Sequence, residues 1–163
     1  MESRRSFIKK SGMLLAAGSL PFGALASRQQ GQNIVITLNV DTSTVDKKDV
    51  NASCNFGQDE SIPNEEYTVH AQIGDTITWQ GASVNAPETD VVNIVSINYE
   101  GGKNVFGQNI LAGDRKNPQR VSGRVQFATP ENQDYKYKIS FTVSNNGKQR
   151  NGTFHIDPKI QVH

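Results

Sequence analysis

Residues 73–106 read IGDTITWQGASVNAPETDVVNIVSINYEGGKNVF, and the rest of the chain is arranged around this stretch. Ile77 and Trp79 lead into a polar loop, and residues 91–99 then alternate apolar and polar side chains before the Gly101-Gly102 turn. Apolar residues at every second position, bounded by Gly, Pro, Asn and Asp, are typical of half-buried β-strands. The stretch therefore predicts two strands. The inward face of the second is expected to consist of Val91, Val95, Ile97 and Tyr99.

The same alternation recurs along the chain and is clearest at residues 135–143. There Tyr, Tyr, Ile, Phe and Val alternate with Lys, Lys, Ser and Thr, so one face is expected to be core and the other solvated. Beyond the first 26 residues no segment has a convincing helical period. Further strands are expected at residues 33–40, 67–71, 76–80, 121–127, 154–156 and 160–162. The pattern predicts an all-β fold, an antiparallel β-sandwich of about seven to eight strands.

Residues 1–26 have the pattern of an export signal. Arg4 and Arg5 precede an apolar segment that is too short to span a bilayer, and Ala26 ends a small-residue cleavage motif before Ser27. The paired arginines resemble a twin-arginine signal, which directs folded proteins across the membrane. An ordinary secretory signal is the alternative. We expect cleavage between Ala26 and Ser27, and a mature protein that is periplasmic or secreted.

The mature part, residues 27–163, is expected to be one domain of balanced charge. It carries 13 basic and 15 acidic groups, a net charge of −2, which does not favour nucleic acid or an anionic membrane as a partner. Cys54 is the sole cysteine, so no intrachain disulfide can form, and we expect a small buried apolar residue there. Trp79 is expected to anchor the core, with exposure for sugar stacking as the alternative.

Catalytic and redox motifs are missing from the sequence. A type 1 copper site requires two His, a Cys thiolate and usually a Met, but Met1 and Met13 lie in the signal and the three histidines, His70, His155 and His163, are scattered. No Gly-x-Ser-x-Gly elbow and no phosphate-binding Gly-rich loop occur. We therefore expect no enzyme activity and no bound cofactor, with His70 and His155 at solvent-facing strand positions.

Acidic and amide side chains gather in the predicted loops, and their oxygens are candidate ligands for one metal ion. Oxygen-rich loops can hold Ca²⁺, and a loop-bound Ca²⁺ can hold sugar hydroxyls. No EF-hand spacing is present, so solvated turn residues are the alternative interpretation. The candidate ligands are Asp41, Asp46, Asp90 and Asn93, with Asn85 and Glu88 nearby in sequence.

Several blocks of the mature chain, taken in order, resemble the bacterial inclusion-body family of PixA and AidA proteins. They are LNVDTSTV at residues 38–45, IGDTITW at 73–79, DVVNIVSINYEGGKNVF at 90–106 and the alternating tail at 154–162. The resemblance implies a β-sandwich of cupredoxin-like or immunoglobulin-like kind without established enzyme activity. This chain departs from the family in its export signal, since the family is named for inclusions in the cytoplasm.

Together these features predict an exported, non-enzymatic β-sandwich that acts as an interaction or self-assembly module. Its partner would be a second copy of itself. The alternative is a calcium-assisted carbohydrate-binding protein, whose partner would be a glycan.

Overall fold

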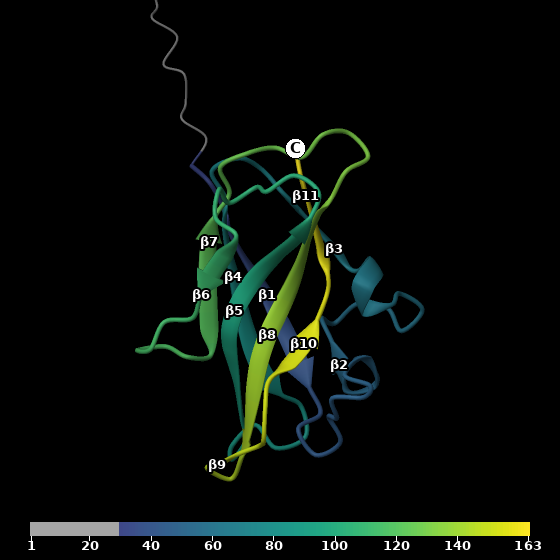
Figure 1. Cartoon of the computed structure of the whole chain (residues 1–163), viewed down its shortest axis with the longest axis vertical. Helices are drawn as coiled ribbons and strands as arrows, with labels where there is room; N and C mark the ends of the chain where they lie inside the picture. Colours follow the sequence, from purple (N-terminus) through teal and green to yellow (C-terminus); the bar gives the residue numbers. More distant parts are fainter. Residues whose placement is uncertain (1–29) are drawn as a thin grey trace, which may run out of the picture.

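The computed structural model describes residues 30–163, which form an all-β arrangement of two sheets (Figure 1). The predicted signal residues Arg4, Arg5, Ala26 and Ser27 lie outside the described residues. Among residues 30–163 no helix has the length and apolarity that crossing a membrane requires.

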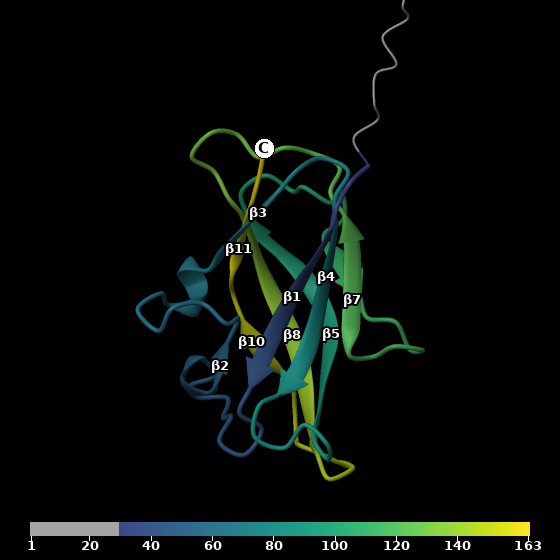
Figure 2. The ribbon, with the colours of Figure 1, turned by 180° about the vertical axis from the view of Figure 1, so that it is seen from behind.

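The first sheet has four strands and is seen in front in Figure 2. Its order is β2 (Cys54–Asn55), β1 (Asn33–Val40), β4 (Thr76–Ser83) and β7 (Arg120–Arg124). The second sheet has seven strands, of which the path β3-β11-β8-β5-β6 is continuous and β9 and β10 also pair with β8. These strands are β3 (Thr68–Ala71), β11 (Lys159–Val162), β8 (Tyr135–Asn145), β5 (Val91–Gly101), β6 (Ile110–Ala112), β9 (Lys148–Gln149) and β10 (Phe154–Ile156). Two 3-10 turns, η1 (Asn51–Ser53) and η2 (Asn64–Glu66), lie in the connection before β3.

The core lies between the two sheets, and aromatic rings fill its centre. Trp79 on β4 is fully buried, and its Nε1–H donates to Tyr137 Oη on β8 at 3.0 Å. The Trp79 ring also packs edge-on against Phe106 and Tyr137. The predictions of Trp79 as a core anchor and of Cys54 as a buried apolar residue are confirmed, and burial raises the pKa of the Cys54 thiol to about 12.

The alternation at residues 135–143 is confirmed in β8, with one informative departure. The odd-numbered residues from Tyr135 to Val143 are buried in the core. Ser140 points to the other face and yet is only 6% exposed, because β10 runs beside it and His155 contacts its hydroxyl. Polar residues on the outer face of a strand are therefore not all solvated in this protein.

The predicted inward face of β5 is wrong in its first half. Val92 and Ile94 are buried while Val95 is 45% exposed, and burial then resumes at Ile97. A β-bulge lies between Ile94 and Ser96 where β5 pairs with β8. An extra residue in one strand shifts the period-two pattern by one position, so the inward side changes from even to odd numbers.

The prediction of a purely antiparallel sandwich is also wrong. β1 runs parallel to β4 from Asn33↔Thr76 to Val40↔Ser83, and β3 runs parallel to β11 from Thr68↔Lys159 to Ala71↔Val162. Parallel neighbours need a long crossover, and the chain between β1 and β4, which contains β2 and β3, supplies one. Alternation reports which side of a strand is buried, but it carries no information on strand direction.

Residues 30–163 contain eleven strands rather than the seven or eight expected, because the expectation did not include the shortest ones. β2 and β9 have two residues each, and β6 has three. In the opposite direction, the strand expected at 121–127 ends at Arg124, and Phe127 is 44% exposed. Strands of two residues are too short to show a period, and the three residues of β6 do not alternate clearly between apolar and polar side chains.

Candidate functional site

Two of the predicted calcium ligands, Asp41 and Asp46, close local turns. Asp41 Oδ1 accepts hydrogen bonds from the backbone N–H and the hydroxyl of Ser43, at 3.0 and 2.6 Å. These bonds hold the pKa of Asp41 below its usual value. Asp46 Oδ1 accepts from the backbone N–H of Lys48 at 2.8 Å. Both are side-chain-to-backbone turns of the kind that Asp commonly forms.

Asp90 is the centre of a buried polar network at the end of the two sheets where β1 and β8 finish and β5 begins. It is 8% exposed, and its Oδ2 accepts from the Thr42 hydroxyl and from Asn145 Nδ2, each at 2.6 Å. Its Oδ1 accepts from the backbone N–H of Asn146 at 3.0 Å. Thr42 follows β1, Asp90 precedes β5, and Asn145 ends β8. Asp90 therefore ties together loops that belong to both sheets.

The fourth predicted ligand, Asn93, lies within β5 opposite Thr142 of β8. Its side-chain Oδ1 is buried and has no hydrogen-bond partner within residues 30–163. Hydrogen bonds link Asp90 neither to Asp46 nor to Asn93, and nowhere in the described part of the chain do three or more His, Cys, Asp or Glu side chains gather around one point. The calcium site stays a prediction.

We expect Asp90→Asn to lower thermal stability at neutral pH and to flatten its acid dependence. The Thr42 hydrogen bond is the main cause that lowers the pKa of Asp90 below its ordinary 3.8. A carboxylate whose pKa is lower in the folded state stabilises the fold fully above its unfolded pKa, and this stabilisation is lost as pH falls through the folded pKa. The difference in melting temperature between wild type and variant should therefore shrink as pH falls below about 4.

Thermal melts between about pH 7 and about pH 2 test this prediction. Asp59→Asn is the matched control, because hydrogen bonds from Ser61 also lower the pKa of that exposed carboxyl, yet it joins no distant segments. A constant difference between wild type and Asp90→Asn across the whole pH range would contradict the role assigned to the charge.

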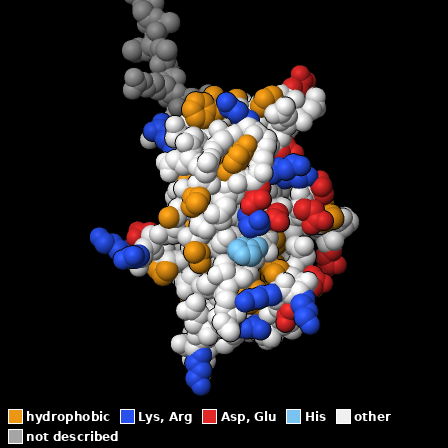
Figure 3. Space-filling model, in the orientation of Figure 1, with side chains coloured by type: hydrophobic (Ala, Val, Ile, Leu, Met, Phe, Trp, Pro, Cys, Tyr) orange, Lys and Arg blue, Asp and Glu red, His pale blue; other side chains and the backbone are white. Residues whose placement is uncertain are grey.

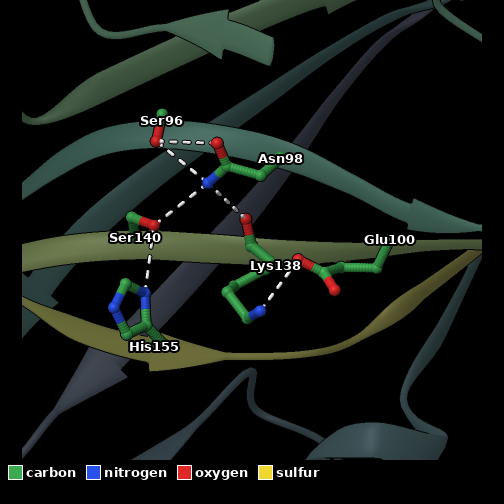
Figure 4. Close-up of polar contacts among 6 residues, drawn as sticks. All are labelled: Ser96, Asn98, Glu100, Lys138, Ser140 and His155. Carbon is green, nitrogen blue, oxygen red and sulfur yellow. Dashed lines mark hydrogen bonds and ion pairs between the residues drawn. The ribbon is translucent and has the colours of Figure 1, made fainter. Parts of the chain in front are cut away.

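A second polar cluster lies on the outer face of the seven-stranded sheet (Figure 4). Asn98 Nδ2 donates to the hydroxyls of Ser96 and Ser140, each at 3.0 Å. Ser140 Oγ lies 3.1 Å from His155 Nδ1, and beside it the Lys138 ammonium pairs with Glu100 at 2.8 Å. Acidic and basic side chains are interspersed over this side of the molecule in Figure 3, around β10 and β11.

The Ser140 hydroxyl contacts the His155 ring, as the hydroxyl of an activated serine would, but the residues around this pair serve to hold strands together. A serine nucleophile needs an accessible hydroxyl and a base that a third group orients. Ser140 is buried and already accepts a hydrogen bond from Asn98. Within residues 30–163 no carboxylate hydrogen-bonds to the His155 ring. The cluster therefore holds β5, β8 and β10 together.

The backbone edge of β1 that faces away from β4 is exposed, and the alternation of side chains alone did not reveal this. β2 pairs with β1 only at Asn39 and Val40, so the preceding residues of β1 have no strand from residues 30–163 on that side, as Figure 2 shows. The carbonyls of Gln32 and Val40 accept from Thr76 and Val84 on the β4 side. Since every second residue of a strand points its N–H and C=O the same way, the odd-numbered Asn33, Val35 and Thr37 direct theirs outward. We call these three backbone positions the open edge.

The open edge lacks the features that usually prevent strand pairing. β1 reads NIVITLNV, which contains no charged residue and no proline, and Val35 is 51% exposed. Edge strands of soluble proteins are commonly protected by lysine, proline, bulges or a covering segment. An uncharged edge that is rich in β-branched residues is suited to accept a further strand.

Two histidines that are far apart in sequence lie together near this edge. His70 lies on β3, and His163 follows β11. The His70 Nδ1 atom lies 3.2 Å from the His163 Nε2 atom, and the two rings are stacked. The interpretation of the histidines as scattered is therefore wrong for this pair. His70 and His155 are exposed, as predicted. The parallel pairing of β3 with β11 brings His70 and His163 together, and alternation does not reveal such a pairing.

Comparison with solved structures finds the same fold in an inclusion body protein. The crystal structure of an inclusion body protein (PixA) from Burkholderia cenocepacia J2315 matches with a TM-score of 0.57 at 13% sequence identity, over 84% of this chain and 99% of that chain. The cysteine protease inhibitor EhICP2 from Entamoeba histolytica matches with a TM-score of only 0.32 at 12% identity, over 81% of this chain and 96% of that chain. No family model and no curated protein matches the sequence.

The likeness to the inclusion body protein supports the resemblance seen in the sequence at the level of the fold. Neither the cupredoxin-like nor the immunoglobulin-like subclass follows from it. The absence of charge from residues 33–40 is visible in the sequence. That absence becomes informative only once β1 is known to lie at a sheet margin, because a central strand would show the same composition.

Proposed function

We propose that this chain is an exported, non-enzymatic β-sandwich protein that associates with copies of itself. The single observation that carries the proposal is the open edge of β1, which is uncharged and, among the residues that the structure describes, unpaired before Asn39. A solved structure of similar fold is that of an inclusion body protein, which points in the same direction. The proposal of export rests on the twin-arginine pattern of Arg4 and Arg5. The expectation of a cupredoxin-like or immunoglobulin-like sandwich rests on the resemblance of the sequence to the inclusion-body family.

A second copy fits the open edge through antiparallel pairing of β1 with itself. Asn33, Val35 and Thr37 point their backbone groups outward, so pairing centred on Val35 places Asn33 opposite Thr37 of the other copy. Such an arrangement forms roughly six backbone hydrogen bonds between the two strands. The same surface is used on both copies, which is the closed two-fold arrangement that most homodimers adopt. Beyond Thr37 each copy's own β2 already pairs with β1 and ends the interface.

Val35→Lys and Val35→Pro test the proposal by different means. Lysine places like charges directly opposite each other at the centre of the paired strands, which is destabilising. Proline removes the outward N–H of residue 35 and spares the bonds between β1 and β4, which even-numbered residues form. We expect wild type to shift from monomer to dimer with rising concentration in sedimentation velocity. Each variant should raise the dissociation constant by about tenfold or more.

Val95→Lys is the matched control. Val95 is 45% exposed, but it lies on β5, which has neighbours on both sides in the sheet. This variant should associate as wild type does. A wild type that sediments as a monomer at every concentration would refute the proposal, and so would a Val95→Lys variant that dissociates as readily as Val35→Lys.

A further inference from the structure

The backbone fixes His70 and His163 on one face of two adjacent strands. In the parallel pairing of β3 with β11, His70 lies opposite Gln161, two residues before His163. The backbone N–H of His163 donates to the carbonyl of Ala71 at 3.0 Å, so the pairing continues to this residue. Residues two apart on a strand share a face. Both imidazoles therefore project from the side opposite the buried Ala71 and Val162.

The distance between the two facing ring nitrogens suits two imidazoles that bind the same metal ion. His70 Nδ1 and His163 Nε2 are 3.2 Å apart. Zinc binds imidazole nitrogen at about 2.0–2.1 Å in tetrahedral geometry, for which two ligand atoms lie about 3.3–3.4 Å from each other. Both rings are exposed, so small rotations can point both lone pairs at one ion and water can complete its coordination.

The surroundings of the pair favour a positive ion. The two rings border a hollow of about 220 Å³ that Gln32, Ile34 and Asp75 also line, and none of its described lining residues is Lys or Arg. Asp75 is only 5% exposed, and its two oxygens accept from the backbone N–H groups of Gln32 and Gln72 at 2.7 and 2.8 Å. The carboxylate is thus held rigidly beside the hollow, where its charge attracts a cation.

We propose that His70 and His163 form a binding site for one divalent transition-metal ion of the zinc class. Imidazole is a ligand that zinc, copper and nickel accept, whereas calcium prefers oxygen. The site contains no thiolate, because Cys54 is buried in the core, so it differs from a type 1 copper centre. It requires one chain only, and it does not depend on pairing at the open edge.

Titration of ZnCl₂ into the purified protein, followed by isothermal calorimetry, tests the site. We expect one ion per chain, and His70→Ala and His163→Ala should each weaken binding by about tenfold or more. His155→Ala is the matched control, since this third exposed histidine lies against Ser140 on the outer face. It should bind zinc as wild type does. Thermal melts without metal confirm that each variant is folded.

A second measurement needs no variant. In wild type, zinc should shift the ring signals of two histidines in the nuclear magnetic resonance spectrum and leave those of the third unchanged. The proposal is overturned if wild type binds no zinc, if the His70 and His163 variants bind as wild type does, or if removing His155 weakens binding equally.

Discussion

Trp79→Ala is expected to destabilise the fold by about 3–5 kcal/mol, the usual cost of truncating a buried aromatic residue to alanine. The Trp79 ring is fully buried between the sheets, where it contacts Phe106 and Tyr137 edge-on. Its removal leaves a cavity that strands fixed on both sides cannot close. It also leaves Tyr137 Oη without the Trp79 N–H donor. Urea denaturation monitored by far-ultraviolet circular dichroism measures the free energy of unfolding directly.

Two further variants separate the contributions at this position. Tyr137→Phe keeps the ring and removes only the acceptor of the Trp79 N–H, so a loss of about 1–3 kcal/mol is expected for a buried donor left without a partner. Phe127→Ala removes an aromatic side chain that is 44% exposed and should cost much less than Trp79→Ala. If Trp79→Ala costs no more than Phe127→Ala, the tryptophan does not lie between the sheets.

Gly102→Ala is the second substitution with a large expected effect, roughly 2–5 kcal/mol from backbone strain and steric overlap combined. Gly102 has a φ of +80°, which disfavours any residue with a Cβ. An added Cβ would overlap the backbone carbonyl of Asp134, immediately before β8. The Tyr99 hydroxyl also donates to the Gly102 carbonyl at 2.6 Å, so moving this turn disturbs β5.

Gly147→Ala is the matched control that measures the cost of backbone strain without steric overlap. Gly147 has a φ of +77°, almost the same as Gly102, but no atom lies within 4 Å of its would-be Cβ. It belongs to the Asn146-Gly147 turn between β8 and β9, and alanine there should cost only the strain of about 1–2 kcal/mol. Equal losses of unfolding free energy for Gly102→Ala and Gly147→Ala would show that the contact with Asp134 carries no cost.

Most strand positions of this protein followed from local pattern, and the candidate sites did not. The buried face of β8 was predicted correctly, since the odd-numbered residues from Tyr135 to Val143 are buried. Asp90, a predicted calcium ligand, ties together loops from both sheets. Sequence could single out a polar residue before a strand, but it could not show which distant donors would occupy its oxygens.

By itself, the sequence of this protein determined which side chains face the core in regular strands such as β8, because alternation with a period of two depends only on neighbouring residues. The tertiary structure decided the rest. The parallel direction of β1 and β4, the bulge after Ile94, the meeting of His70 with His163 and the unpaired margin of β1 all depend on which distant segments pair. A strand carries its hydrogen-bonding groups along both edges whatever its side chains are, so local composition cannot specify which edge finds a neighbour and which stays open.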